Sequence, residues 1–175
     1  MKDTKRSIKR LTVSAMLVAL GVVVLWLGSM VDVLSISMAV IASLFGVFAL
    51  LEYGKGTPWL VFAATGILSL LLLPRKEPAV LYVLFFGYYP ILKALLERKR
   101  PLVAWILKEL LFHAALILLL LLSRWLLLGG ASEPIFYTVA TVLLAEIAFP
   151  LYDVALTRLI VLYLRKWRDR LRIGK

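Results

Sequence analysis

Apolar residues run along almost the whole chain in blocks, and short stretches rich in charge, proline or glycine separate these blocks. Most blocks reach the length of about 20 residues that an α-helix needs to cross the hydrocarbon core of a bilayer. The pattern predicts an all-α, polytopic integral membrane protein with six transmembrane helices. The predicted spans are 11–30, 33–52, 57–73, 79–97, 101–128 and 134–164.

Proline and glycine mark the joints between the predicted spans. Gly54 and Pro58 precede or open the third span, and Pro74 and Pro78 precede the fourth. A proline costs least in the first turn of a helix, where its missing N–H would have no partner. The six helices account for the chain and no internal repeat is visible. We therefore expect a single six-helix membrane domain over residues 1–175.

Composition supports a membrane protein and excludes several other classes. The chain is 63% apolar, against about 45–50% for a soluble domain. It contains no cysteine, which excludes disulfides and thiolate metal sites. The net charge of +11 comes from basic residues at the ends of apolar spans. That placement is typical of membrane topology, and we expect no nucleic acid as a partner.

The placement of the basic residues also predicts the orientation. With the N-terminus inside, the cytoplasmic segments hold the basic leader, residues 98–100 and the tail from Arg165, whereas the outer loops hold Arg75 and Lys76. The positive-inside rule then gives an N-in/C-in protein of the cell membrane. A basic leader before an apolar run is also how a signal peptide begins. With five spans behind it, we expect 11–30 to be retained.

Ionisable side chains inside the spans are costly, so they are candidates for function. His113 and Glu146 both fall near the middle of their spans, where neutral His113 can hydrogen-bond Glu146. This pair either joins the fifth and sixth helices or contacts a substrate. Lys108 and Asp153 lie nearer the cytoplasm at similar depth, and we expect an ion pair between them because a lone charge would be expensive there.

The outer halves of three helices carry aromatic and polar side chains suited to an organic ligand. Tyr82, Phe86 and Tyr89 share one face of the fourth predicted helix. Aromatic rings with one cation can hold a flat or anionic organic molecule. The same residue types also concentrate at the interface of any membrane protein. The further candidates are Arg124 and Trp125 in the fifth helix, and Tyr137 and Thr141 in the sixth.

The first predicted helix carries Ala15 and Ala19, four residues apart on one face. Small side chains at this spacing let the backbone of a second helix approach closely. The second helix belongs either to this protein or to a partner.

The length, the six spans, the basic leader, "AMLVA" at 15–19 and "FPLYDVALTRLIVLYLRK" in the last helix together resemble the S components of energy-coupling factor (ECF) transporters. These are the substrate-capture subunits of prokaryotic ABC-type vitamin importers. The resemblance implies that Ala15 and Ala19 dock on a membrane coupling subunit, which cytoplasmic ATPase subunits drive. It also implies a small organic, vitamin-like substrate on the outer side, under a first loop that contains Asp32. Family members for nickel or cobalt carry an N-terminal histidine-containing metal site, whereas this chain has only His113, so we expect no metal.

Two other classes compete with this interpretation. A membrane enzyme is disfavoured because the chain lacks HExxH, GxSxG and GxxxxGK[ST] motifs, and we expect neither catalysis nor a cofactor. The alternative is a membrane scaffold of the rod-shape-determining six-helix type, which organises cell-envelope enzymes. Those proteins usually carry a glycine-rich segment followed by an aspartate, and "LEYGKGTPWLVFAATG" has the glycines without the aspartate.

Overall fold

A computed structural model describes residues 2–54, 56–126 and 135–167, and these residues are helical without any strand. The chain divides into two compact units, Met1–Ala104 (unit 1) and Trp105–Lys175 (unit 2).

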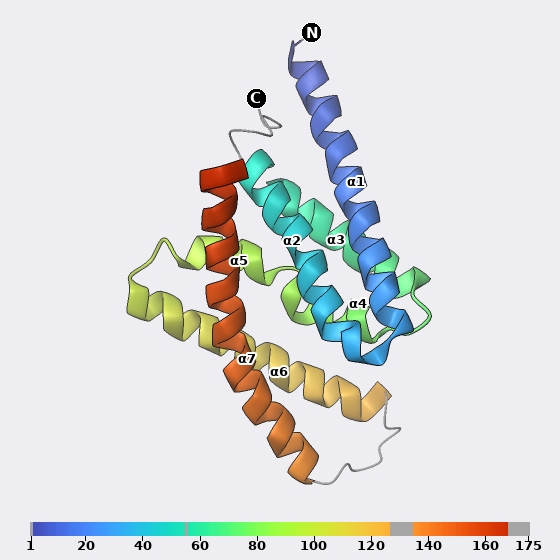
Figure 1. Ribbon diagram of the computed structural model, residues 1–175, viewed down its shortest axis with the longest axis vertical. Helices are drawn as coiled ribbons and strands as arrows, with labels where there is room; N and C mark the ends of the chain where they lie inside the picture. Colours follow the sequence, from blue (N-terminus) through green and yellow to red (C-terminus); the bar gives the residue numbers. More distant parts are fainter. Residues whose placement is uncertain (1, 55, 127–134, 168–175) are drawn as a thin grey trace. The chain divides into compact units, whose positions relative to one another are not determined.

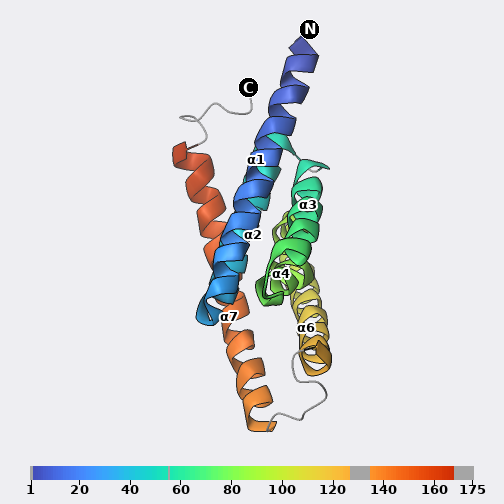
Figure 2. The same ribbon diagram turned by 90° about the vertical axis from the view of Figure 1, so that its right-hand side faces the viewer.

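Unit 1 is built on three helices that pack against one another. They are α1 (Lys2–Met30), α2 (Ser35–Tyr53) and α3 (Gly56–Leu72), and a single 3-10 turn (Asp32–Leu34) links the first two. Each of the three contacts the other two. Because α2 runs opposite to α1 and α3, the start of α1, the end of α2 and the start of α3 share one end of the unit (Figures 1 and 2).

Glycines on α1 allow this close packing. A Cβ atom at Gly21 would lie 3.0 Å from Cγ2 of Thr65 on α3, and one at Gly28 would lie 2.8 Å from Cβ of Met38 on α2. Leu25, between the two glycines, is fully buried. The inner face of α1 is therefore defined by small residues that let α2 and α3 come close.

The fourth apolar stretch is a broken helix. It consists of α4 (Glu77–Leu81), a π-helical turn, η2 (Tyr82–Phe86), and α5 (Tyr89–Leu96). The predicted span 79–97 therefore exists, but it is not one continuous α-helix. Together the three pieces form an apolar stretch long enough to cross a membrane, Glu77–Leu96.

Local chemistry explains the break. Pro90 stands in the first turn of α5, and without an N–H it cannot continue the backbone ladder of the preceding helix. The N–H of Gly87 donates to the carbonyl of Tyr82, five residues earlier, at 2.7 Å. A Cβ at Gly87 would lie 2.5 Å from Cδ2 of Phe62, so only glycine lets this turn pack so closely against α3.

Unit 2 consists of two long helices and a final turn. α6 (Pro101–Leu126), whose first turn belongs to unit 1, is followed by α7 (Ile135–Leu162) and a π-helical turn, η3 (Tyr163–Trp167). The rings of Phe112 on α6 and Phe149 on α7 stack with their centroids 4.5 Å apart and an interplanar angle of 11°.

Five helical stretches in the described part of the chain are long and apolar enough to cross a membrane, and α3 is a shorter apolar helix. The five are Ser7–Met30, Ser35–Tyr53, Glu77–Leu96, Pro101–Ser123 and Thr138–Lys166. The predicted all-α class is confirmed for the described residues, and the helices have the composition of a membrane-embedded protein. The glycines of the last predicted loop and most of the basic tail, residues 127–134 and 168–175, lie outside the described residues.

Candidate functional site

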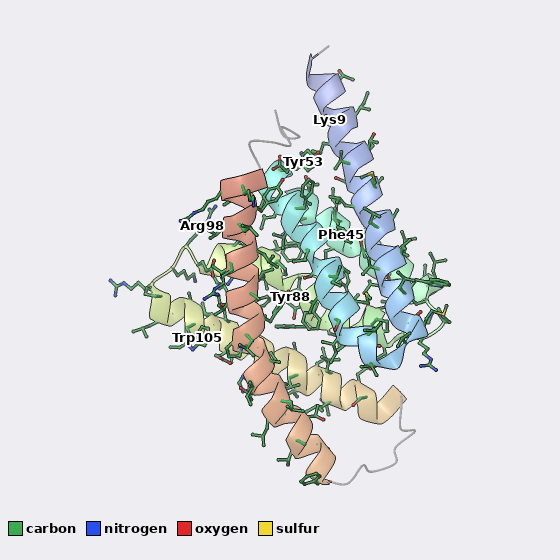
Figure 3. All side chains as sticks on the ribbon, viewed as in Figure 1. Lys9, Phe45, Tyr53, Tyr88, Arg98 and Trp105 are labelled. Carbon is green, nitrogen blue, oxygen red and sulfur yellow. The ribbon has the colours of Figure 1, made fainter. Side chains whose placement is uncertain are left out.

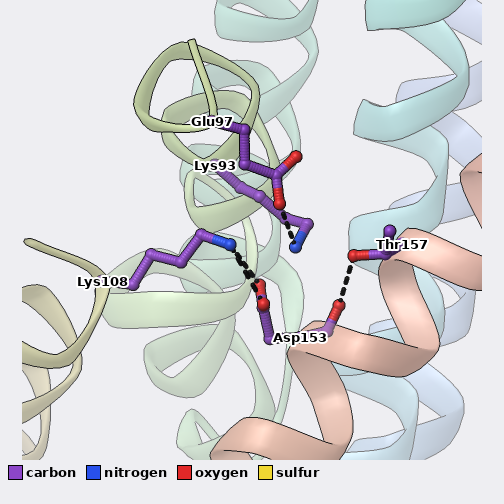
Figure 4. Close-up of polar contacts among 5 residues, drawn as sticks. All are labelled: Lys93, Glu97, Lys108, Asp153 and Thr157. Atoms are coloured by element: carbon purple, nitrogen blue, oxygen red, sulfur yellow. Dashed lines mark hydrogen bonds and ion pairs between the residues drawn. The ribbon is translucent and has the colours of Figure 1, made fainter. Parts of the chain in front are cut away.

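The predicted ion pair between α6 and α7 is present. Nζ of Lys108 lies 3.0 Å from Oδ2 and 3.2 Å from Oδ1 of Asp153, and both side chains are buried (Figure 4). The hydroxyl of Thr157, one turn further along α7, donates to the backbone carbonyl of Asp153 at 2.9 Å. A buried ion pair needs such good geometry, because desolvating both charges is expensive.

The second predicted contact between these helices is present as well. Nε2 of His113 lies 3.0 Å from Oε1 of Glu146, and Nδ1 of His113 lies 2.8 Å from the backbone carbonyl of Glu109, one turn earlier on α6. A carbonyl can only accept, so Nδ1 must carry a proton. The tautomer of His113 is thus determined by its own helix.

This tautomer limits what the pair can do chemically. With Nδ1 protonated, Nε2 either accepts a proton from a neutral Glu146 carboxyl or donates as part of an imidazolium to the carboxylate. In both arrangements the pair holds one proton between the two atoms and has no net charge. The side chains are partly exposed within the structure, so a polar group outside the pair can reach them.

The two polar contacts and the aromatic stack between them follow from one antiparallel register. The residue numbers decrease along α6 while they increase along α7. The contacting pairs are His113 with Glu146, Phe112 with Phe149, and Lys108 with Asp153. Pro150 stands inside α7 and has no N–H to donate to the carbonyl of Glu146 four residues earlier. The side chain of Glu146 therefore contacts His113, and its backbone carbonyl lacks the usual N–H donor four residues later in the helix.

The contact between His113 and Glu146 is expected to contribute modestly to stability. Hydrogen bonds between membrane helices contribute about 0.6 to 2 kcal/mol, so Glu146→Ala should leave a folded protein that unfolds more readily. A double-mutant cycle with His113→Ala, read from unfolding in detergent, measures the coupling. Glu146→Gln is the control, because its amide still donates to Nε2. Strict additivity of the two alanine changes would mean that the residues do not interact.

The aromatic candidates of the fourth span lie in the core of unit 1. Tyr82 and Tyr89 are fully buried, and Phe86 is partly buried. The ring of Tyr89 packs against Phe85, with the centroids 4.9 Å apart. Contact between these rings and a ligand stays a prediction, and in this conformation their surfaces are taken up by protein.

The remaining ligand candidates are less defined by the structure. Thr141 is an exposed residue on α7. The other four side chains lie outside the part of the structure that is described, and they are Asp32, Arg124, Trp125 and Tyr137. Within the described residues, no group of three histidine, cysteine, aspartate or glutamate side chains could hold a metal ion.

Ala15 and Ala19 are both exposed on α1, whereas Leu17 and Gly21 of the same helix are buried. The alanine pair therefore lies on a different face of α1 from the glycines that pack against α2 and α3. Two small-residue faces on one helix mean that α1 allows a second close helix approach.

Two sets of polar side chains in unit 1 are more deeply buried than the sequence indicated. Thr57, Thr65 and Ser69 repeat at multiples of four along one face of α3 and are almost fully buried. The hydroxyls of Thr57 and Ser69 have no hydrogen-bond partner. Their spacing was the signal available in the sequence. The side chain of Lys93 is only 1% exposed although it pairs with Glu97 at 2.7 Å (Figure 4).

No family model, no curated protein and no solved structure matches this chain.

Proposed function

We propose that this chain is the substrate-capture subunit, or S component, of an ECF-type importer in a prokaryotic cell membrane. In this proposal six spans carry both termini on the cytoplasmic side. The chain binds a small, vitamin-like organic molecule from outside and docks on a membrane coupling subunit driven by cytoplasmic ATPase subunits. It performs no catalysis itself.

The observation that carries the proposal is the exposed alanine pair on α1. On α1, the small residues that pack within unit 1 include Gly21 and Gly28, which face Thr65 and Met38. Ala15 and Ala19 are not needed for that packing because they are exposed. A pair of methyl groups one turn apart gives another membrane helix a close path along α1. We take that helix to belong to the coupling subunit.

The substrate site of the proposal is built on the last two spans. His113 and Glu146 offer a hydrogen-bonding pair near the middle of α6 and α7. Intramembrane ionisable residues of this kind commonly mark a substrate pathway. The candidates in the outer halves of the same two spans, Arg124, Trp125, Tyr137 and Thr141, would then contact the organic part of the ligand.

Native mass spectrometry of the detergent-solubilised protein tests this function. The wild-type chain is expected to retain a stoichiometric small organic molecule, and Glu146→Ala or His113→Ala is expected to reduce that retention. Arg75→Gln, a change in a predicted outer loop, is the matched control and should retain the molecule. A chain that carries no small molecule after purification, and none after incubation with a mixture of vitamins, would contradict the proposal and favour the membrane scaffold.

A further inference from the structure

The first turns of α1 carry basic residues on one side of the helix. Lysine or arginine occupies positions 2, 5, 6, 9 and 10, and Asp3 is the acidic residue among the first ten. The helix is continuous from Lys2 to Met30, and residues three or four apart on a helix are neighbours on its surface. At about 100° per residue, the five positions fall within an arc of about 140°. We call these five positions the basic stripe.

Two residues of the basic stripe have described side chains, Lys9 and Arg10, and both are exposed. Lys9 lies toward the end of unit 1 where α1 begins (Figure 3). Nη2 of Arg10 lies 3.8 Å from the position that a Cβ on Gly56 would take, at the start of α3. Glu52, in the last turn of α2, is partly buried at the same end. Among the described charged side chains at this end of unit 1, the two exposed ones are therefore basic.

The apolar residues around the basic stripe indicate its depth in the membrane. The apolar stretch of α1 that is long enough to cross a membrane begins at Ser7, so the stripe overlaps its first turn. Trp59, in the first turn of α3 at the same end of unit 1, is 39% exposed, and tryptophan concentrates at membrane interfaces. Lysine and arginine at the edge of the hydrocarbon layer extend their charged groups into the headgroup region. The basic stripe therefore lies at the level of the lipid headgroups.

Exposed apolar side chains in the same turns indicate which anionic partner fits. Ile8 is 59% exposed and Leu11 is 72% exposed, and they flank Lys9 and Arg10 in the sequence. A soluble acidic partner would bind the charges and leave these apolar side chains in water. A phospholipid satisfies both kinds of side chain, because its headgroup meets the charges and its acyl chains meet the apolar groups. Clusters of four to eight basic residues beside a membrane span are typical of binding to anionic lipids.

We propose that the basic stripe of α1 binds the headgroups of anionic phospholipids. The ammonium and guanidinium groups make charge-assisted contacts with the phosphate oxygens. Each lysine or arginine near an anionic membrane surface strengthens such binding about fivefold. Because the stripe belongs to a helix that continues into the apolar span, the bound lipids hold the start of α1 at the membrane interface.

Lipid binding to the purified full-length protein tests this proposal. Delipidated protein in detergent is titrated with phosphatidylglycerol or with phosphatidylcholine of the same acyl chains, and the bound lipids are counted by native mass spectrometry. The wild-type protein is expected to bind phosphatidylglycerol at least fivefold more tightly, because the headgroup of phosphatidylcholine carries a phosphate without net charge. Equal affinity for the two lipids would overturn the proposal.

Matched variants locate the lipid site on α1. Lys9→Gln is expected to weaken phosphatidylglycerol binding about fivefold, and Lys9→Gln with Arg10→Gln more than tenfold, while phosphatidylcholine binding stays unchanged. Lys9→Arg with Arg10→Lys keeps both charges and should bind as the wild type does. Arg75→Gln, which removes a basic residue from the α3–α4 turn, should also bind as the wild type does. Wild-type binding by the glutamine variants, or an equal loss in either control, would overturn the site.

Discussion

Lys108→Met is expected to destabilise the protein by about 3–5 kcal/mol, because it removes the ammonium that lies 3.0 Å from the buried carboxylate of Asp153. The two charges lie 3.0 Å apart and both side chains are buried, so water cannot replace the lost ammonium. Methionine keeps most of the apolar stem of lysine, which confines the change to the charge. Unfolding in mixed micelles, followed by tryptophan fluorescence, measures the loss.

A second substitution, at Asp153, separates the effect of charge from the effect of packing. Adding Asp153→Leu to Lys108→Met should recover most of the lost stability, because an apolar pair of similar volume needs no ionic partner. Lys99→Met is the control, since Lys99 is exposed in the α5–α6 turn, and it should have little effect. A double variant as unstable as the sum of its single changes would show that the ion pair is not the cause.

Under the proposed function, Ala15→Leu together with Ala19→Leu is expected to abolish co-purification with a coupling subunit while the protein stays folded and still binds a ligand. Each leucine adds bulk to a face of α1 that is exposed in the structure, so the added atoms push a docking helix away without disturbing unit 1. Co-expression with the coupling subunit and the ATPase subunits, followed by affinity purification, measures the loss of the complex.

Gly21→Leu is the contrasting variant on the same helix. A Cβ at Gly21 already lies 3.0 Å from Thr65, so this change overpacks the core and should cost about 1–3 kcal/mol. If the two alanine changes lower stability as Gly21→Leu does, the alanines pack inside the protein. If they leave both stability and the complex unchanged, the pair faces lipid and the docking surface is elsewhere.

The positions of the helices could be predicted closely because particular residue types determine where the helices begin and end. Proline at 58, 78 and 101 opens a helix, and the apolar blocks between the breakers have the length that a membrane dictates. The pairs Lys108–Asp153 and His113–Glu146 were also predictable. Antiparallel helices that cross the same apolar layer bring residues of equal depth together, and the cost of a lone charge selects the partner.

The break in the fourth span was not predictable from its apolar pattern. Tyr82, Phe86 and Tyr89 are spaced for one face of a continuous helix, but Gly87 packs under Phe62 and the backbone takes up a π-helical turn. In an ideal α-helix this spacing would place the three rings on one face. The spacing does not indicate whether protein or ligand covers that face. Tertiary contacts decide this, and here protein covers Tyr82 and Tyr89.

The antiparallel register of α6 and α7 acts as a lock against sliding. A shift of α7 by one turn, about 5.4 Å, would in one direction bring the carboxyl of Glu146 level with that of Glu109. In the other direction it would bring Asp153 level with the ring of Phe112. Both displaced states separate two polar pairs at once, so no intermediate position offers a partial gain. Sliding of α7 along α6 is therefore opposed by both polar contacts at once.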